Sequence, residues 1–87
     1  MRFEDAVVVK ADKYAIGTET LSGRHYVSFP VSNGFVDYEE YYEITPTDFE
    51  RYRDDPPTAR TFVDECRRRQ HDELLMVKPG RLRGNPI

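Results

Sequence analysis

Hydrophobic and polar positions alternate over two neighbouring segments, and this alternation predicts a β-hairpin. Residues 24–31 (RHYVSFPV) and 34–44 (GFVDYEEYYEI) both place apolar side chains at every second position, which is the period of a β-strand. Between them, Asn33-Gly34 supplies the two positive φ values of a two-residue type I′ turn. Such a turn pairs Val31 with Val36 and Phe29 with Tyr38.

Pro30 argues against perfect pairing next to this turn, because proline has no backbone N–H to donate to the opposite strand. We expect the pairing there to be loosened, or shifted by two residues through a longer loop. A shift of two residues keeps every side chain on its face. In both registers one face of the second strand is expected to be buried, with Val36, Tyr38, Tyr42 and Ile44, and the other meets solvent or a partner, with Asp37, Glu39, Tyr41 and Glu43.

Three further segments are expected to be extended. Residues 4–10 (EDAVVVK) form a β-branched run that fits a strand buried along its length. Residues 14–16 fit a short second strand, followed by a loop of small polar residues over 17–23. Residues 74–77 (LLMV) fit a closing strand.

After Ile44 the pattern changes to that of two helices. Thr45-Pro46 has a capping threonine followed by proline at the first helical position, so a helix begins at about Thr45. The segment Asp54-Asp55-Pro56-Pro57 ends it and offers Asp55 as the cap of a second helix over about 56–70. The second helix has one apolar stripe with helical spacing, formed by Ala59, Phe62, Val63 and Cys66.

The order of strands, then two helices, then a strand predicts an α+β fold. We expect an antiparallel sheet of three to five strands with the two consecutive helices packed on one face. A single α+β domain is expected over residues 1–78. Residues 79–87 have too little apolar content to fold, so a mobile C-terminal tail is expected there.

Size and composition narrow the class of protein. An 87-residue domain with one cysteine has no internal disulfide and no four-cysteine zinc site, so we expect a reduced, cytoplasmic protein. The chain has neither an apolar run of roughly 20 residues nor a signal-peptide pattern, which gives no reason to expect membrane contact. Neither metal-ligand spacing nor a catalytic motif is present, so no metal, cofactor or catalytic residue is assigned.

The charge distribution points to a protein partner. Residues 37–55 carry eight acids and two arginines, whereas residues 56–87 carry four acids and seven bases. An acidic strand face repels phosphate, so nucleic acid is not expected as a ligand, and a basic protein is favoured. Tyrosine suits such interfaces, because its ring is amphipathic and has few rotamers to order. The expected partner-binding residues are Tyr26, Asp37, Glu39, Tyr41 and Glu43, with an ordinary solvated acidic surface as the alternative interpretation.

Glu40 is the one acid that alternation places on the apolar face of the hairpin, with His25 diagonal to it. A buried carboxylate next to a histidine is typical of a general acid/base pair and equally of a structural ion pair. A bulge that turns Glu40 outward is a third interpretation. His25 and Glu40 are therefore predicted as a buried polar pair.

The segment GRHYVSFPVSNGFVDYEEYYEI and the helix pair after it resemble small single-domain bacterial proteins of unassigned function. Over residues 23–75 the chain is similar in size, charge and layout to immunity proteins encoded beside polymorphic toxins. That resemblance implies a non-enzymatic, immunity-type inhibitor of a basic protein, such as a toxin domain. Two alternatives remain: a small accessory or regulatory domain that docks in a larger bacterial assembly or self-associates, for example as a homodimer, and a small enzyme that uses His25 and Glu40.

Overall fold

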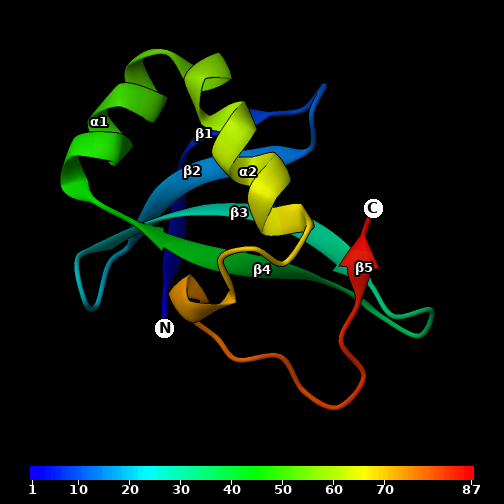
Figure 1. Ribbon diagram of the computed structural model, residues 1–87. Coiled ribbons are helices and arrows are strands. Elements are labelled where there is room, and N and C mark those ends of the chain that lie inside the picture. The colour runs from blue at the N-terminus through cyan, green and yellow to red at the C-terminus, as the bar shows by residue number, and fades with distance from the viewer.

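A five-stranded antiparallel sheet forms one layer of the molecule in the computed structural model, which describes all residues from 1 to 87 (Figure 1). Four strands pair in chain order: β1 (Phe3–Val9), β2 (Tyr14–Glu19), β3 (Arg24–Ser32) and β4 (Asp37–Ile44). The fifth strand, β5 (Asn85–Pro86), pairs with the C-terminal end of β3, at Val31 and Ser32. The helical elements are α1 (Pro46–Asp54), the 3₁₀ helix η1 (Pro56–Ala59), α2 (Arg60–Arg67) and the 3₁₀ helix η2 (Asp72–Leu74).

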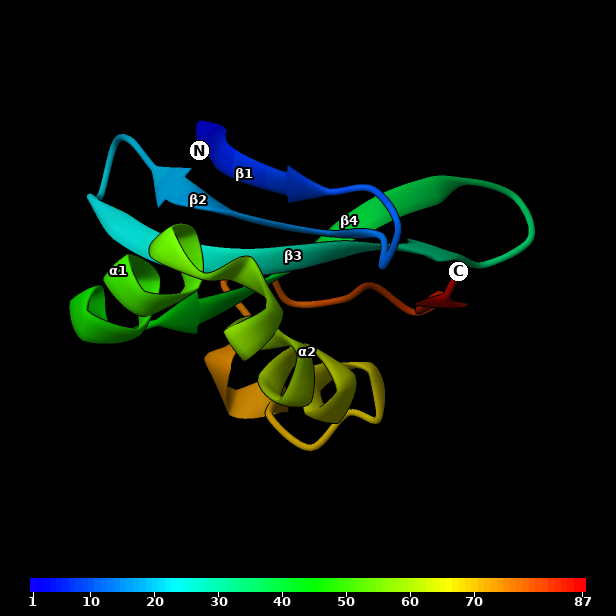
Figure 2. The same ribbon diagram turned by 90° about the horizontal axis from the view of Figure 1, so that it is seen from above.

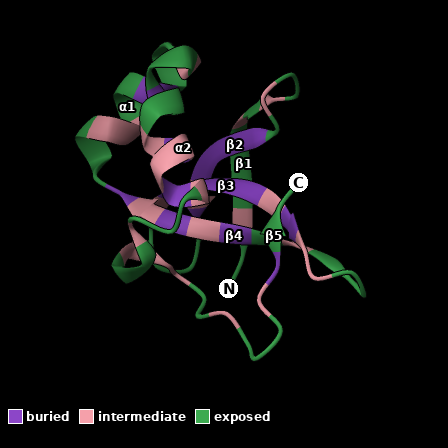
Figure 3. Cartoon of the chain, turned by 45° about the vertical axis from the view of Figure 1, so that its right-hand side comes forward, coloured by how far each residue is buried: buried purple, intermediate pink, exposed green.

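The predicted α+β class is confirmed, because both main helices lie on the same side of the sheet (Figure 2). We call the sheet face under the helices the inner face and the opposite one the outer face. The buried core lies between the inner face and the helices, and burial is concentrated in β2, β3 and the second half of β4 (Figure 3). Its members are Tyr14, Ile16, Val27, Phe29, Val31, Tyr42, Ile44, Tyr52, Ala59, Val63 and Cys66.

The β3–β4 hairpin has the longer of the two expected registers. Val31 pairs with Tyr38 and Pro30 with Glu39, so the strands are shifted by two residues from the pairing that a two-residue turn would give. The faces are unchanged by the shift, as expected. The loop between the strands therefore contains four residues, 33–36.

Asn33 organises this loop with its side chain, so a type I′ turn is not formed. Its Oδ1 accepts hydrogen bonds from the backbone N–H groups of Phe35 and Val36, at 2.9 and 3.0 Å. Gly34 takes the positive φ that the loop needs, at +89°. Phe35 is 87% exposed and Val36 55% exposed. The expectation that Val36 is buried is thus wrong, because the longer loop lifts it out of the sheet.

The helix boundaries follow their predicted signals in part. Thr45 caps α1, accepting a hydrogen bond from the N–H of Asp48 at 3.1 Å, as predicted. Asp55 precedes the second helix but makes no side-chain capping bond, so its predicted role is wrong. The second helix starts as a 3₁₀ turn at Pro56-Pro57 and becomes α-helical at Arg60. No helix in the chain combines the length and the apolar character that crossing a membrane demands.

β1 is an edge strand, so the expectation that it is buried along its length is wrong. A bulge at Ala6 interrupts its pairing with β2, where Asp5 pairs with Gly17 but Val7 pairs with Ile16. The extra residue changes which side chains face the helices. Phe3 and Asp5 lie on the outer face, whereas Val7 packs against the core on the inner face.

The expected strand at residues 74–77 is also wrong. Leu74 belongs to η2, and Leu75 makes only an isolated bridge with Tyr42. The next residue, Met76, donates its backbone N–H to the carbonyl of Tyr41 at 2.9 Å. Leu75 and Met76 therefore cover part of the edge of β4 that faces away from β3, without forming a strand.

Gly17 sits under the ring of Tyr26 on the outer face. A Cβ at this position would collide with the backbone oxygen of Glu4 and lie 2.5 Å from the Tyr26 hydroxyl oxygen. The absence of a side chain here is what lets Tyr26 lie flat against the sheet.

We expect Gly17→Ala to lower the free energy of unfolding by about 1 to 3 kcal/mol, because the added methyl group has to displace backbone and a buried ring. Urea denaturation measures this change. Gly80→Ala is the matched control, since a Cβ there meets no atom within 4 Å. Equal stability of Gly17→Ala and wild type would show that the packing of Tyr26 does not need the space left by Gly17.

Glu19 organises the β2–β3 turn from a buried position. Its carboxylate accepts backbone hydrogen bonds from Arg2 at 2.8 Å, Leu21 at 2.9 Å and Ser22 at 2.9 Å. The hydrogen bond of the Ser22 side chain, followed by those of the backbone, lowers the pKa of Glu19 to about 2, from an ordinary value of 4.5.

A pKa that is lower in the folded state stabilises the fold above pH 4.5, and this contribution is lost as the pH falls toward 2. Glu19→Gln should therefore reduce stability at pH 7, and the difference from wild type should shrink between about pH 4.5 and 2. Thermal unfolding across this range measures it. Glu50→Gln, an exposed change of the same charge, is the control. A Glu19 carboxyl that titrates near 4.5 by NMR would contradict the expectation.

Candidate functional site

The outer face of β4 carries the acidic residues that were expected to meet a partner. Alternation along the strand places Asp37, Glu39, Tyr41 and Glu43 together on this face, opposite Ser32, Pro30, Ser28 and Tyr26 of β3. Asp37 and Glu39 are exposed. Glu43 differs from them, because Arg24 forms an ion pair with it at 2.6 Å and lowers the pKa of its carboxyl group.

Tyr26 is fully buried, so the expectation that it is available for contact with a partner is wrong. The ring of Phe3 stacks on Tyr41 with 3.6 Å between centroids, and both rings meet the Tyr26 ring edge-on. The Tyr26 hydroxyl donates a hydrogen bond to Asp5 at 2.6 Å. We call Phe3, Tyr26 and Tyr41 the outer aromatic cluster. The burial of this cluster depends on the small residue Gly17 and on the bulge in β1. Neither feature identifies a buried face from the sequence alone.

Negative charge around this cluster has no cation to balance it. Asp5, Asp37 and Glu39 form no ion pair, in contrast to Glu43. Partial loss of water around the carboxyl group raises the pKa of Glu39, a hydrogen bond from Ser28 opposes that rise, and the charge of Asp5 adds to it. Burial likewise raises the pKa of Tyr41, with smaller contributions from Glu39 and Asp5. The carboxylates of Glu39 and Asp5 are thus close enough to repel each other, and a positively charged partner would reduce this repulsion.

His25 and Glu40 do not form the predicted pair. The ring of His25 stacks on Phe49 with 4.0 Å between centroids, and its Nδ1 lies 2.8 Å from the hydroxyl of Thr18. Glu40 is buried on the inner face, as alternation predicted, with only 6% of its surface exposed. Its partner is Arg83, whose Nε donates to Oε2 at 2.8 Å. The buried carboxylate therefore belongs to a structural ion pair.

Arg83 connects the C-terminal segment to two other parts of the molecule, β4 and η2. Its guanidinium group also forms an ion pair with Asp72 at 2.7 Å and lies 3.2 Å from the hydroxyl of Tyr42. The hydrogen bonds that Arg83 donates to Asp72 and Glu40 raise its pKa, so it stays charged. The hydroxyl of Tyr42 completes the group by donating to Glu40 at 2.8 Å.

The remainder of the C-terminal segment also contacts the sheet. The N–H of Gly84 donates to the Tyr38 hydroxyl at 2.7 Å, and a Cβ at Gly84 would lie 2.8 Å from the backbone of Ser32. The mobile tail expected over 79–87 thus has specific contacts at residues 82–87, while its motion in solution stays a prediction. Sequence reasoning missed Arg83, because nothing near it in the chain links it to Glu40.

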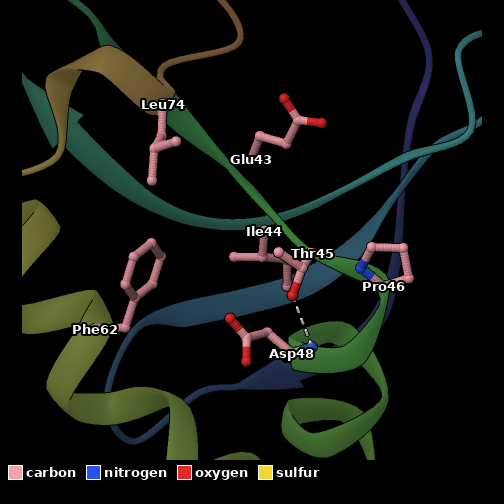
Figure 4. A pocket seen from close by; sticks show the side chains of 7 residues that line it. All are labelled: Glu43, Ile44, Thr45, Pro46, Asp48, Phe62 and Leu74. Carbon is pink, nitrogen blue, oxygen red and sulfur yellow. Dashed lines mark hydrogen bonds between the residues drawn. The ribbon is translucent and has the colours of Figure 1, made fainter.

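An open pocket of about 330 Å³ lies where β4 runs into α1 (Figure 4). Phe62 comes from α2 and Leu74 from η2, and they line it from the helix side. Ile44 and Pro46 add apolar surface, with Glu43, Thr45 and Asp48 as the polar lining. Glu43 belongs both to this pocket and to the acidic face of β4.

The remaining reactive side chains have structural surroundings. Cys66 is buried in the core as predicted, and burial raises the pKa of its thiol to about 12, so it stays protonated. His71 packs on Phe62 and lies 2.8 Å from a carboxylate oxygen of Glu65. No group of three or more His, Cys, Asp or Glu side chains converges to a metal-binding arrangement.

Replacing Arg83 with methionine should lower the free energy of unfolding by about 2 to 4 kcal/mol, because Glu40 would remain buried without its cation. Chemical denaturation measures this change. Arg81→Met is the control, since Arg81 is exposed and forms no ion pair. The double variant Glu40→Gln/Arg83→Met should recover part of the loss, and additive losses would contradict the coupling.

Comparisons of the chain with protein-family models, with curated proteins and with solved structures found no match. The geometry of the molecule is therefore the basis for assigning a function. It offers an acidic outer face around an aromatic cluster, an adjoining pocket and a buried ion pair that holds the C-terminal segment in place.

Proposed function

We propose that this protein is a non-enzymatic binding module that presents the outer face of β4 to a basic protein partner, as an immunity-type inhibitor does. One observation carries the proposal: Asp5, Asp37 and Glu39 lie on the outer face without a cation. Seven of the other thirteen acids of the chain do have one, since they form ion pairs with arginine. Unpaired carboxylates on a strand are the groups that a positive surface would bind.

The outer aromatic cluster supports the proposal because it gives these carboxylates a rigid base. Tyr41 is held by stacking on Phe3, so its exposed part loses little conformational freedom when a partner binds. An aromatic centre with a charged rim is the usual composition of a strong protein interface. Tyr41 would form the centre here, with Glu39 and Asp37 at the rim.

The pocket beside Glu43 extends this interface toward α1. Its apolar lining suits the methylene stem of a lysine or arginine side chain of the partner, and Glu43 and Asp48 lie where the charged end would emerge. Both carboxylates already have an arginine neighbour, Arg24 for Glu43 and Arg51 for Asp48. The pocket is therefore assigned a secondary role, and the unpaired carboxylates the primary one.

Such a surface could inhibit a nucleic-acid-cleaving enzyme by placing carboxylates where substrate phosphates would bind. Opposite charges on the two proteins would also speed their association, since long-range attraction raises the rate of encounter. This attraction is screened by salt, with a Debye length of about 10 Å at 0.1 M. Association with the partner should therefore slow as salt is added.

The test uses the protein as bait in low-salt extracts of its source cells, followed by kinetics with the captured protein. We expect a protein with a basic surface, whose association rate falls about tenfold for Asp37→Asn/Glu39→Gln and falls with added salt. Glu50→Gln/Asp55→Asn is the control, because it removes the same charge from exposed positions outside the outer face. Equal association rates for both variants, or the capture of no basic protein, would overturn the proposal.

A further inference from the structure

One edge of the sheet has no segment covering it. The outer edge of β4 is partly covered by Leu75 and Met76, and the stretch of β3 beyond β2 is paired with β5. β1 pairs with β2 alone, and Figure 2 shows it at the rim of the molecule with no segment beyond it. An open edge presents unpaired backbone N–H and C=O groups, which favour pairing with another strand.

Protection of this edge is limited to its first half. Glu4, Asp5 and the bulge at Ala6 are features that hinder pairing with another strand. After the bulge come Val7, Val8 and Val9, which are β-branched and carry no charge. Val8 lies on the outer face and is 56% exposed, while Val7 and Val9 are only partly buried against the core. The second half of β1 is thus apolar, regular and uncovered.

We propose that the second half of β1 pairs in antiparallel fashion with the same segment of a second copy of this chain, joining the two sheets into one. A two-fold axis at Val8 places Val8 opposite Val8 of the second copy and Val7 opposite its Val9. This register uses only residues beyond the bulge, so the backbone pairing is regular in both copies. It also keeps the inner faces of the two sheets on the same side, where the partly exposed valines cover one another.

The charges of β1 favour a second copy over an unrelated strand. Lys10 follows Val9 at the start of the β1–β2 turn, and Asp5 lies on the other side of the bulge. In the proposed register Lys10 of each copy lies just beyond the paired valines, beside the bulge and Asp5 of the other copy. The pairing therefore forms two symmetric pairs of opposite charge, whereas a parallel pairing would bring the two lysines together.

A contact between two short strand segments is small, and small interfaces bind weakly. We expect a reversible dimer with a dissociation constant on the order of 10 µM or weaker. This inference can be tested separately from the proposed function, because the dimer brings Lys10 beside Asp5 but leaves Asp37 and Glu39 free.

Sedimentation velocity from about 5 µM to 1 mM tests the proposal. We expect a shift from monomer to dimer, weakened at least tenfold by Val8→Lys, which puts two like charges at the two-fold axis. Val36→Lys is the matched control, since Val36 is equally exposed at 55% but lies in the β3–β4 loop. Lys10→Glu should also weaken the dimer, and it keeps the test decisive if Val8→Lys fails to fold.

A protein that is monomeric over the whole concentration range would overturn the proposal. The same holds for a dimer that is unchanged by Val8→Lys and Lys10→Glu, or that Val36→Lys weakens as strongly, since the contact would then lie elsewhere. Asp37→Asn/Glu39→Gln should leave the dimer intact, so failure of this inference and failure of the proposed function are distinguishable.

Discussion

The buried ion pair between Glu40 and Arg83 is the interaction on which the rest of the structure depends. A carboxylate on the inner face of a sheet would be costly to bury alone, so a cation has to reach it. The cation comes from residue 83, and it brings the C-terminal segment across the edge of β4. The pairing of β5 with β3 and the contact of Gly84 with Ser32 follow from that path. One charge inside the core thus fixes where residues 83–86 lie on the sheet.

The two faces of the sheet are unlike each other because of a single extra residue in β1. The bulge at Ala6 lets the strand direct Phe3 and Asp5 to the outer face and Val7 and Val9 to the inner one. Without it, alternation would direct Phe3 to the inner face, and Phe3 would not stack on Tyr41. With it, the outer face has a small apolar centre of its own, on which carboxylates are held in fixed positions.

Local patterns in the sequence predicted the parts of the fold that depend on neighbours in the chain. The alternation over residues 24–44 gave the correct faces of the hairpin, and Thr45-Pro46 gave the start of α1. Asn33-Gly34 led to the wrong prediction of a two-residue turn, because the Asn33 side chain closes a four-residue loop instead. The same alternation correctly predicted the face on which Asp37, Glu39 and Glu43 lie. The burial of Tyr26 and the identity of the partner of Glu40 were not predicted, since they depend on Phe3 and Arg83, far away in sequence.

The distance in sequence between Glu40 and Arg83 has a consequence for synthesis of the protein. A nascent chain exposes its strands and helices first, and the carboxylate inside its core stays unpaired until residue 83 has been added. Chains that stop before this point, through early termination or proteolysis, would hold an uncompensated charge in their interior. Because marginally stable proteins are removed by cellular proteases, such fragments should be short-lived. Durable folding is therefore conditional on synthesis having reached Arg83.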